Sequence, residues 1–597
     1  MSDKADGISR GVSVVQENGI FTASPTSTRP VERYAGNFDR AYFGYYASKG
    51  LDNGWVGVRC WDNKEKKVSD EFILWDDWGY DHFGKNLGDD HAAPSIIVLK
   101  YQRGENHVHN GKVLAAAAEH GSYEADRGRL QVRRSSESED ISSWDTPVTL
   151  ESKNNTYANL IEASNGTVWL FVRRRHQGCS YQSLHYWKSQ DAGETWDGPS
   201  LVADWYKHVP MSMVYFAVCE NVDHSEIHVM FNFCYTVGRR AFYRDIYHAY
   251  YDVKSSTWKT KSGELLTVPF VIGAESDNCA DLVYKTQGEK YLFGENESGS
   301  VKSDPDQIFI QLWKSSASGK LSSLRYYGSE QGKIKVAVYA NNNGKPGELL
   351  LANNEAQVVQ SPVNKWYVAF LGGSIEITKG DSYWLAVVSD KKGVVNHRGA
   401  GTASGVAFGK HHTFNNDFPN SLNLDEFWET ASSRCINAYQ ETDRTDVIQV
   451  MVDGEGEVSL LSMNRPSYST LPGMHSTWGQ VNLHYYNNGW RMEGIHPSGT
   501  GRGGTYLASA NFEGRNPNAV YLTPFDGNKK TQLQRWERLS GKWTKTDDIT
   551  SGTLGHNIRP HSVRNGEGGL LLLWSYVERY DGFLGGQWKS TIMACFR

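Results

Sequence analysis

Tryptophan recurs in this chain at intervals of about fifty residues, each time after a strand-like run and a short polar turn. Trp144 and Trp196 are 52 positions apart, Trp490 and Trp543 are 53 apart, and a further unit carries Trp258. One such unit, with four short strand-like runs, cannot bury both faces of its own sheet and needs similar units on each side. The recurrence therefore predicts a β-propeller.

The composition favours the same class of fold. Glycine (59 residues), tyrosine (32) and tryptophan (20) are abundant. Aromatic-rich runs that are broken by glycine and asparagine are typical of strands and turns. Long runs of leucine, alanine, glutamate and lysine with a helical period are almost absent. We therefore expect an all-β chain.

The recurrence stops between Trp258 and Trp490. This interval holds alternating strand-like runs joined by NNNG, KPG and KGD turns, and its last strand is expected in RCINAYQE. These segments resemble the jelly-roll β-sandwich modules of extracellular enzymes. We predict a seven-bladed propeller with an inserted β-sandwich. The expected boundaries are 1–30 for an N-terminal arm, 31–302 and 443–597 for the propeller, and 303–442 for the insert.

Charge and hydropathy exclude two classes of partner. The formal net charge of −6 is small for 597 residues, and no basic stripe with interleaved aromatics indicates nucleic acid. No apolar run reaches the roughly 20 residues that a membrane helix needs. The start, MSDKADGISRGVSVV, lacks the basic and then apolar pattern of a secretory signal.

The seven cysteines are odd in number and widely spaced, without a CxxC pair. This pattern favours buried free thiols over a disulfide framework. One thiol with distant histidines leaves room for a structural metal ion, although no short-spacing signature indicates one. We assign no residue as a metal ligand.

The stretch KSQDAGETWDGP, residues 188–199, fits the pattern Ser-x-Asp-x-Gly-x-Thr-Trp, which is the Asp-box of sialidase-like propellers. A sialidase also needs an arginine triad, a Tyr–Glu pair and a Phe/Tyr-Arg-Ile-Pro segment near the start of the propeller. The nearest text, NIRPH at 557–561, lies in the last predicted blade. We interpret the box as a turn device, in which Ser189 and Asp191 bind backbone donors and Trp196 packs between strands.

Five polar residues lie at the borders of apolar runs in the first half of the chain. They are His91, His120, Tyr157, Arg173 and Tyr215. In a propeller, such borders are where strands reach the mouth of the central funnel. We therefore expect these side chains to meet in one site.

This layout resembles the propeller-type polysaccharide lyases, especially the ulvan lyases and the rhamnose–glucuronate lyases. Their pattern begins with Asp-His-x-x-Pro-Ser, here residues 90–95, and a second histidine at the end of the next strand, here His120. A tyrosine and an arginine sixteen positions apart follow as Tyr157 and Arg173, and a further tyrosine as Tyr215. The resemblance is most specific over 89–216 and leaves out the insert.

The two histidines of this pattern are farther apart here than in that family. We attribute the difference to an enlarged hairpin, YQRGENHVHNG, which brings two further histidines, His107 and His109. The segment VGRRAFYRDIYHAYYD adds Arg240 and Tyr243 as candidate substrate-binding residues. In the last blade, Asn557, Arg559 and His561 either line the funnel or lie on a solvated face.

The resemblance implies β-elimination at a uronic acid, with His91, Tyr157 and Arg173 as the catalytic residues. Arg173 would neutralise the sugar carboxylate with a bidentate pair. His91 or Tyr157 would remove the proton at carbon 5. The pKa of histidine, about 6.5, suits this role, whereas tyrosine, at about 10, needs a nearby cation. His120 and Tyr215 would bind or orient the sugar.

The sequence thus predicts a secreted or periplasmic, monomeric polysaccharide lyase acting on an acidic polysaccharide, either ulvan or a rhamnose–glucuronate glycan. No cofactor is required for this elimination. The alternatives are a non-catalytic carbohydrate-binding propeller and a sialidase-like glycoside hydrolase. Exposed aromatics of the insert, such as Trp366, Tyr367 or Trp384, either bind sugar or pack within the sandwich.

Overall fold

The computed structural model describes residues 12–596 apart from several ranges. These ranges are 22–27, 48–53, 79–89, 121–127, 176–181, 206–212, 238–239, 273–279, 287–289, 295–299, 331, 353–356, 360–364, 399–406, 431–435, 441–442, 467–478, 499–508, 525–529, 564–569 and 580–588. Within the described residues, the helices are the short 3-10 helices η1 (Asp90–Ala92), η2 (Gly104–His109) and η3 (Leu424–Glu426). All other regular structure is β-strand, so the predicted all-β class is confirmed.

The chain divides into two compact units. Unit 1 comprises Met1–Lys285, Arg444–Arg465 and Ser476–Arg597. Unit 2 comprises Thr286–Asp443 and Pro466–His475. Unit 2 therefore begins before the expected boundary at 303.

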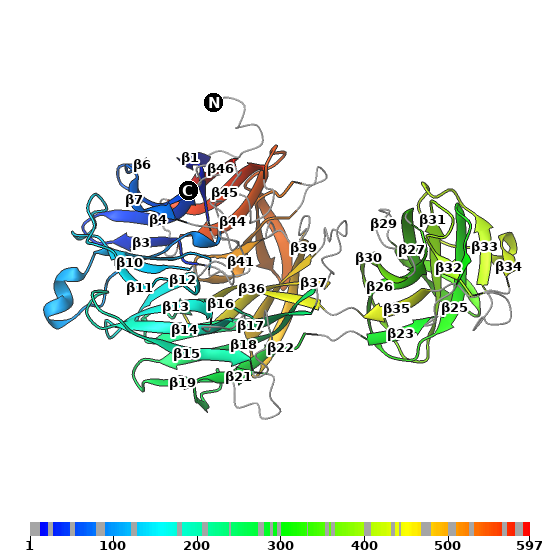
Figure 1. The fold of residues 1–597 in the computed structure, drawn as a ribbon, viewed down its shortest axis with the longest axis horizontal. Helices are drawn as coiled ribbons and strands as arrows, with labels where there is room; N and C mark the ends of the chain where they lie inside the picture. The colour runs from blue at the N-terminus through cyan, green and yellow to red at the C-terminus, as the bar shows by residue number, and fades with distance from the viewer. Residues whose placement is uncertain are drawn as a thin grey trace. The chain divides into compact units, whose positions relative to one another are not determined.

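Unit 1 consists of sheets whose strands follow one another along the chain (Figure 1). Before residue 286 these strands are β2 (Gly19–Ile20), β3 (Val31–Ala35), β4 (Asp39–Ala47), β5 (Gly54–Asp62), β6 (Lys67–Val68) and β7 (Phe72–Trp78); β8 (Ser95–Val98), β9 (Val113–Ala118), β10 (Leu130–Arg134) and β11 (Val148–Glu151); β12 (Asn155–Glu162), β13 (Val168–Arg175), β14 (Gln182–Ser189) and β15 (Asp197–Trp205); and β16 (Met213–Glu220), β17 (Glu226–Val237), β18 (Arg240–Asp252), β19 (Thr257–Lys259), β20 (Leu265–Leu266), β21 (Phe270–Ile272) and β22 (Asp281–Tyr284).

Three further groups of strands follow in the second part of unit 1. They are β36 (Asp443–Val452), β37 (Val458–Pro466), β38 (Gly479–Tyr486) and β39 (Trp490–Ser498); β40 (Ala510–Glu513), β41 (Asn516–Leu522), β42 (Gln534–Leu539) and β43 (Lys542–Asp548); and β44 (His556–Ser562), β45 (Leu570–Arg579) and β46 (Lys589–Phe596). The last of these sheets has a fourth strand, β1 (Val12–Glu17), which pairs with β46 through Val12 and Cys595. Both ends of the described chain therefore complete one sheet.

The first strand of a sheet is often buried along its whole length. All four residues of β8 and all eight of β12 are buried. Leu114 of β9 belongs to the same core cluster as Leu160 of β12 and Leu170 of β13, so neighbouring sheets pack against each other. This packing is what a unit of fifty residues needs in order to cover both faces of its sheet.

A buried ionic network joins several sheets of unit 1. Glu32 of β3 forms ion pairs with Arg29, at 2.9 Å, and with Lys100, which follows β8. Arg29 also pairs with Glu220, at the end of β16, and Arg515, in the turn after β40, lies 3.6 Å from the same carboxylate. Burial opposes ionisation of Glu32, but Lys100 and Arg29 outweigh it and lower its pKa to about 2.

The Asp-box forms the turn between β14 and β15. Ser189 Oγ accepts the backbone N–H of Gly193 at 2.8 Å, and Asp191 Oδ1 accepts that of Thr195 at 2.8 Å. Trp196 donates its indole N–H to the Gly193 carbonyl at 3.1 Å and packs against the core cluster of β9 and β12. Gly193 has a φ of 89°, which favours glycine. The predicted role as a turn device is confirmed.

Unit 2 contains two larger sheets that share one core. Their strands are β23 (Lys290–Gly294), β35 (Ile436–Gln440), β26 (Gly319–Gly328) and β30 (Lys365–Ile377) in one, and β28 (Lys345–Ala352), β27 (Gly332–Asn342), β31 (Ser382–Ser389), β25 (Gln307–Lys314), β33 (Ala407–His411), β34 (Trp428–Thr430) and β29 (Gln357–Val359) in the other. Strands β24 (Val301–Lys302) and β32 (Asn396–His397) form a small separate sheet. Leu324 of the first large sheet packs in one cluster with Val336 and Val387 of the second.

The early start of unit 2 has a simple cause, because β23 pairs with β35 and two strands from opposite ends of unit 2 therefore meet in one sheet. Trp384, a candidate sugar-binding residue, is 2% exposed and belongs to the core. The side chains of Trp366 and Tyr367 lie outside the described residues.

Other expectations concern metals, thiols and membranes. Among the described residues, no group of three or more His, Cys, Asp or Glu side chains suits a metal ion, and no helix is long and apolar enough to cross a bilayer. The cysteines that the structure describes are buried free thiols, as predicted: Cys60, Cys219, Cys234 and Cys595. The other cysteines lie outside the described ranges: Cys179, Cys279 and Cys435.

Candidate functional site

The two histidines of the lyase-like pattern stack on each other. His91 lies in η1, directly before β8, and is 2% exposed. His120 follows β9, which runs antiparallel to β8 with Ser95 opposite Ala116, so both histidines lie at the same end of this sheet. Their ring centroids are 4.2 Å apart and their planes differ by 12°. His120 is half-buried.

The histidines of the enlarged hairpin lie elsewhere. His107 and His109 belong to η2, which connects the other ends of β8 and β9. His109 Nε2 is 3.7 Å from Glu194 Oε1, in the Asp-box turn. The structure therefore brings His120, and neither hairpin histidine, to His91.

Tyr157 occupies a bulge in β12. Its φ is 61°, in the left-handed region that bulky residues rarely adopt, and the register with β13 shifts between Thr156 and Asn159. A bulge reorients the side chain that it carries, and such strain is retained where the surrounding fold enforces it. The Tyr157 ring is buried, with its centroid 5.3 Å from that of His91.

Arg173 lies between two phenol rings. Its Cζ is 4.6 Å from the centroid of Tyr157 and 4.7 Å from that of Tyr215. Its Nη1 donates a hydrogen bond to Met213 Sδ at 3.6 Å, and the side chain is buried. Met213 begins β16 and pairs with Gln182 of β14, which joins the strands β12–β15 and β16–β22 into one sheet beside the guanidinium.

Two further tyrosines extend this row. The ring centroid of Tyr215, on β16, is 6.1 Å from that of Tyr157 and 5.1 Å from that of Tyr243, on β18. Tyr243 Oη donates a hydrogen bond to Tyr215 Oη at 3.3 Å. Arg240 begins β18, but its side chain lies outside the described residues.

We call this continuous row the aromatic–arginine cluster. Its members are His120, His91, Tyr157, Arg173, Tyr215 and Tyr243. They come from three successive groups of strands, β8–β11, β12–β15 and β16–β22, and the sequence analysis selected all of them. The contact of Met213 with Arg173 was missed, because a methionine at the start of an apolar strand gives no sign of it.

The candidates of the last blade have mainly structural contacts. Asn557 is buried and accepts the indole N–H of Trp574 at 2.9 Å. Arg559 repeats the bulge of Tyr157, with a φ of 56°, and donates to the Phe21 carbonyl at 2.5 Å. His561 packs edge-on against the Phe21 ring.

Comparisons with known proteins bear on the fold that carries this cluster. A family model described as "BNR repeat-containing family member" matches residues 40–327. The structure of an ulvan lyase, described as a new family of polysaccharide lyase, is 12% identical, with 98% of each chain covered and a TM-score of 0.55. The chain has the fold of this ulvan lyase. The resemblance to a propeller-type polysaccharide lyase is thereby confirmed at the level of fold.

Two further solved structures of polysaccharide lyases are also similar to this chain. An ulvan lyase of this kind bound to -[GlcA(1-4)Rha3S]- gives the same 12% identity, coverage of 98% of each chain and TM-score of 0.55. The polysaccharide lyase Uly1 is 9% identical, with 91% of this chain and 100% of that chain covered and a TM-score of 0.36. A comparison with curated proteins finds no match.

Proposed function

We propose that this chain is a polysaccharide lyase that cleaves a uronic-acid-containing polysaccharide by β-elimination, with ulvan or a rhamnose–glucuronate glycan as substrate. The observation that carries the proposal is the buried guanidinium of Arg173 between two phenol rings, beside the stacked pair of His91 and His120. An ulvan lyase of the same fold supports it.

Arg173 is the group that neutralises the carboxylate. The proton at carbon 5 of a uronate is weakly acidic while the adjacent carboxylate keeps its full charge. A guanidinium binds a carboxylate with two parallel hydrogen bonds, and its planar shape fixes the direction of approach. At a buried position this charge acts with little screening by water. The negative charge that develops after proton removal is therefore stabilised where it forms.

The proton transfers fall to His91 and Tyr157. One of them takes the proton from carbon 5, and the electron pair of that bond forms the double bond between carbons 4 and 5. The bond from carbon 4 to the glycosidic oxygen then breaks, and Tyr157 returns a proton to the leaving oxygen. The guanidinium of Arg173 faces the Tyr157 ring at 4.6 Å, and a cation at that position favours a phenol that gives up its proton.

The surrounding residues position the sugar in this proposal. His120 is half-buried and stacks on His91, so it contacts the substrate and holds the imidazole of His91. Tyr215 and Tyr243, joined by their hydroxyls, form the far side of the subsite. Arg240 is kept as a candidate for a neighbouring sugar unit.

The architecture that we propose for this activity is a seven-bladed propeller with an inserted jelly-roll sandwich. The proposed count takes the sheet that β1 shares with β46 as one blade and divides the 11-stranded sheet of β12–β22 into two. The cluster uses the starts of β8, β12 and β16, which are neighbouring first strands. Unit 2 would be the sandwich.

The decisive experiment is the ultraviolet absorbance of the product. The purified chain is incubated with ulvan, gum arabic and other uronate polymers, and only a lyase creates the conjugated unsaturated uronate that absorbs. Arg173→Ala and His91→Ala should abolish the signal. Tyr157→Phe keeps the ring but not the hydroxyl and should slow turnover by about 10²–10⁴-fold if the phenol transfers a proton.

Three outcomes would contradict the proposal. Full activity of Arg173→Ala would refute the assigned neutraliser. New reducing ends without unsaturation would indicate a hydrolase. Binding of a uronate polymer without either product would indicate a carbohydrate-binding propeller.

A further inference from the structure

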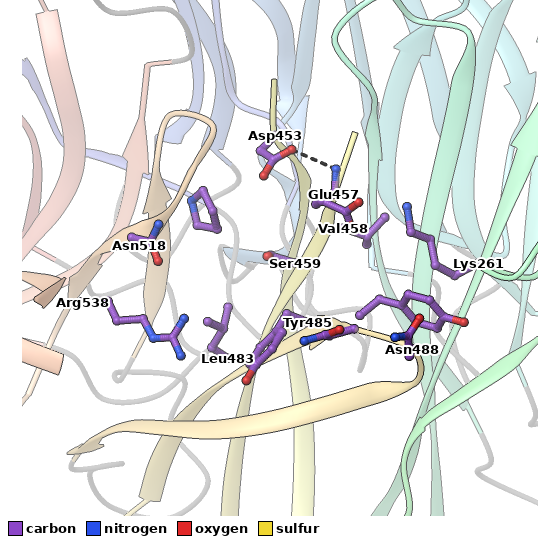
Figure 2. Close-up of a pocket in the computed structure, with 13 residues that line it drawn as sticks. Lys261, Asp453, Glu457, Val458, Ser459, Leu483, Tyr485, Asn488, Asn518 and Arg538 are labelled. Atoms are coloured by element: carbon purple, nitrogen blue, oxygen red, sulfur yellow. Dashed lines mark hydrogen bonds between the residues drawn. The ribbon is translucent and has the colours of Figure 1, made fainter. Parts of the chain in front are cut away.

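A cleft of about 550 Å³ lies in unit 1, apart from the aromatic–arginine cluster (Figure 2). Its lining comes from the segment after β19, from the β36–β37 and β38–β39 turns with adjacent strand residues, and from β41 and β42. The lining residues are Lys261, Asp453, Glu457, Val458, Ser459, Leu483, Tyr485, Tyr486, Asn487, Asn488, Pro517, Asn518 and Arg538.

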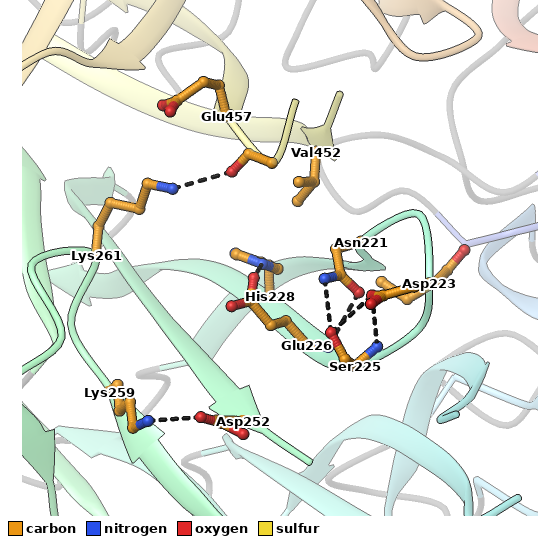
Figure 3. Close-up of polar contacts among 12 residues, drawn as sticks. Asn221, Asp223, Ser225, Glu226, His228, Asp252, Lys259, Lys261, Val452 and Glu457 are labelled. Carbon is orange, nitrogen blue, oxygen red and sulfur yellow. Dashed lines mark hydrogen bonds and ion pairs between the residues drawn. The ribbon is translucent and has the colours of Figure 1, made fainter. Parts of the chain in front are cut away.

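This cleft lies at the end of unit 1 where the turns that follow β16, β36 and β40 are found. Lys261 Nζ donates to the carbonyl of Gly456, in the β36–β37 turn, at 3.0 Å (Figure 3). Arg515, in the turn after β40, donates to the carbonyls of Val452 at 2.7 Å and Asn221 at 3.3 Å. The turns after β16, β36 and β40 thus lie together. The aromatic–arginine cluster uses the opposite, starting ends of β12 and β16, so it is a different site.

The polar side chains of the cleft border solvent. Glu457, Asn488 and Asn518 are exposed and Tyr485 is half-buried, whereas Ser459 is 4% exposed. Together they offer a hydroxyl, two amides, a phenol and a carboxylate to one cavity. Such a lining suits a ligand that carries several hydrogen-bonding groups.

The charges of the cleft are balanced within it. Arg538 pairs with Glu493, with Nη2 at 2.7 Å from Oε2. Asp453 Oδ1 accepts the backbone N–H of Glu457 at 2.8 Å, which shapes the turn (Figure 2). The other ionisable lining residues are one lysine, Lys261, and two carboxylates, Asp453 and Glu457. The cleft therefore offers no excess positive charge to a polyanion, in contrast to the cluster around Arg173.

The apolar part of the lining suits a ring. The guanidinium of Arg538 lies over Tyr485, 5.6 Å from its centroid, and holds this phenol in place. Leu483 and Val458 form an apolar floor with Pro517 nearby. A tyrosine offers both a flat apolar face and a hydroxyl, which is the combination that a sugar ring with apolar faces and hydroxyl edges requires.

We propose that this cleft is a carbohydrate-binding site for a neutral saccharide unit, separate from the aromatic–arginine cluster. The hydroxyls of the sugar bind Glu457, Ser459 and the asparagine amides, while its ring packs on Tyr485. The proposal does not depend on catalysis at Arg173. If the chain is a lyase, this cleft holds a neutral sugar of the polymer while a uronate sugar is bound at the aromatic–arginine cluster, at the opposite end of unit 1.

Saturation-transfer difference NMR with the full chain tests the proposal, because it detects weak ligands of large proteins. The probes are the methyl glycosides of rhamnose, glucose, galactose and mannose, with methyl glucuronide as the charged comparison. At least one neutral glycoside should receive saturation from the wild type and from Arg173→Ala alike. Retained binding in Arg173→Ala separates this cleft from the proposed active site, and its loss there would overturn the proposal.

The carboxylate of Glu457 has a matched control in Glu455, which lies on the same turn, is exposed and does not line the cleft. Glu457→Ala should weaken binding about tenfold, since a hydrogen bond to a charged acceptor is lost, and Glu455→Ala should leave it unchanged. Tyr485→Phe should keep ring contacts, whereas Tyr485→Ala should abolish binding. Equal effects of the two glutamate substitutions, stronger binding of the glucuronide, or no signal with any neutral glycoside would overturn the assignment.

Discussion

The ionic network around Glu32 allows a quantitative test of how unit 1 is held together. Glu32 is buried between Lys100 and Arg29, and its pKa falls from the ordinary 4.5 to about 2. Each unit corresponds to about 1.36 kcal/mol, so ionised Glu32 contributes about 3 kcal/mol. The value agrees with the cost of about 3–5 kcal/mol for removing one member of a buried ion pair.

The sign of the pH dependence follows from the lowered pKa. The contribution is complete above pH 4.5, where Glu32 is ionised in the folded and unfolded chain alike. It is lost as the pH falls from 4.5 towards 2, because the unfolded chain then binds a proton that the folded chain does not. At pH 3, about 2 kcal/mol should already be gone.

The measurement is urea unfolding of wild type and Glu32→Gln between pH 7 and pH 3. The variant should be about 3 kcal/mol less stable at pH 7, and its stability should fall less steeply below pH 4.5. The control is Glu330→Gln in unit 2, whose ion pair with Lys302 is 45% exposed on both sides and should contribute less than about 1 kcal/mol. A loss at Glu32 no larger than at Glu330, or an unchanged acid slope, would refute the reasoning.

Three further predictions concern the site and the Asp-box. Arg173→Lys keeps the positive charge but loses the two parallel hydrogen bonds of a guanidinium, so kcat/KM on a uronate polymer should fall at least about tenfold. The control is Arg174→Lys, on the same strand but paired with Glu151, which should retain activity. Equal losses in the two variants would contradict the role assigned to Arg173. His120→Ala should raise KM or lower kcat, and His107→Ala neither; the reverse result would move the second histidine to the hairpin. Gly193→Ala should lower the free energy of unfolding by about 1–3 kcal/mol, because its φ is 89° and the new Cβ would lie 3.0 Å from Leu114 Cδ1; an unchanged urea midpoint would contradict this strain.

The repeating part of the fold was predictable because its causes are local. A tryptophan every fifty residues, a turn of fixed pattern and short aromatic strands follow from packing within one unit and against its neighbours. The start of unit 2 was not predictable in this way. It depends on the pairing of Lys290 with Gln440, which are far apart in the chain and share no local signal.

In the candidate site, too, some features could be predicted from the sequence and others could not. That His91 and His120 lie at the same end follows from the antiparallel order of their strands. The position of the Tyr157 ring depends on a bulge in β12, where Tyr157 has a φ of 61°. The residues next to Tyr157 give no sequence signal that predicts this bulge. For Trp384 the sequence left two roles open, sugar binding and packing within the insert, and the structure places it in the core of unit 2.

The pairing of β1 with β46 has a consequence for how the chain is made. Val12 is synthesised well before its partner Cys595, so β1 has no neighbour to pair with until the residues between them have been made. Contacts of such separation form slowly, and until then the last sheet ends in an open edge that another chain can occupy. The order of synthesis therefore leaves β1 unpaired for longer than the strands that pair with their neighbours in the sequence.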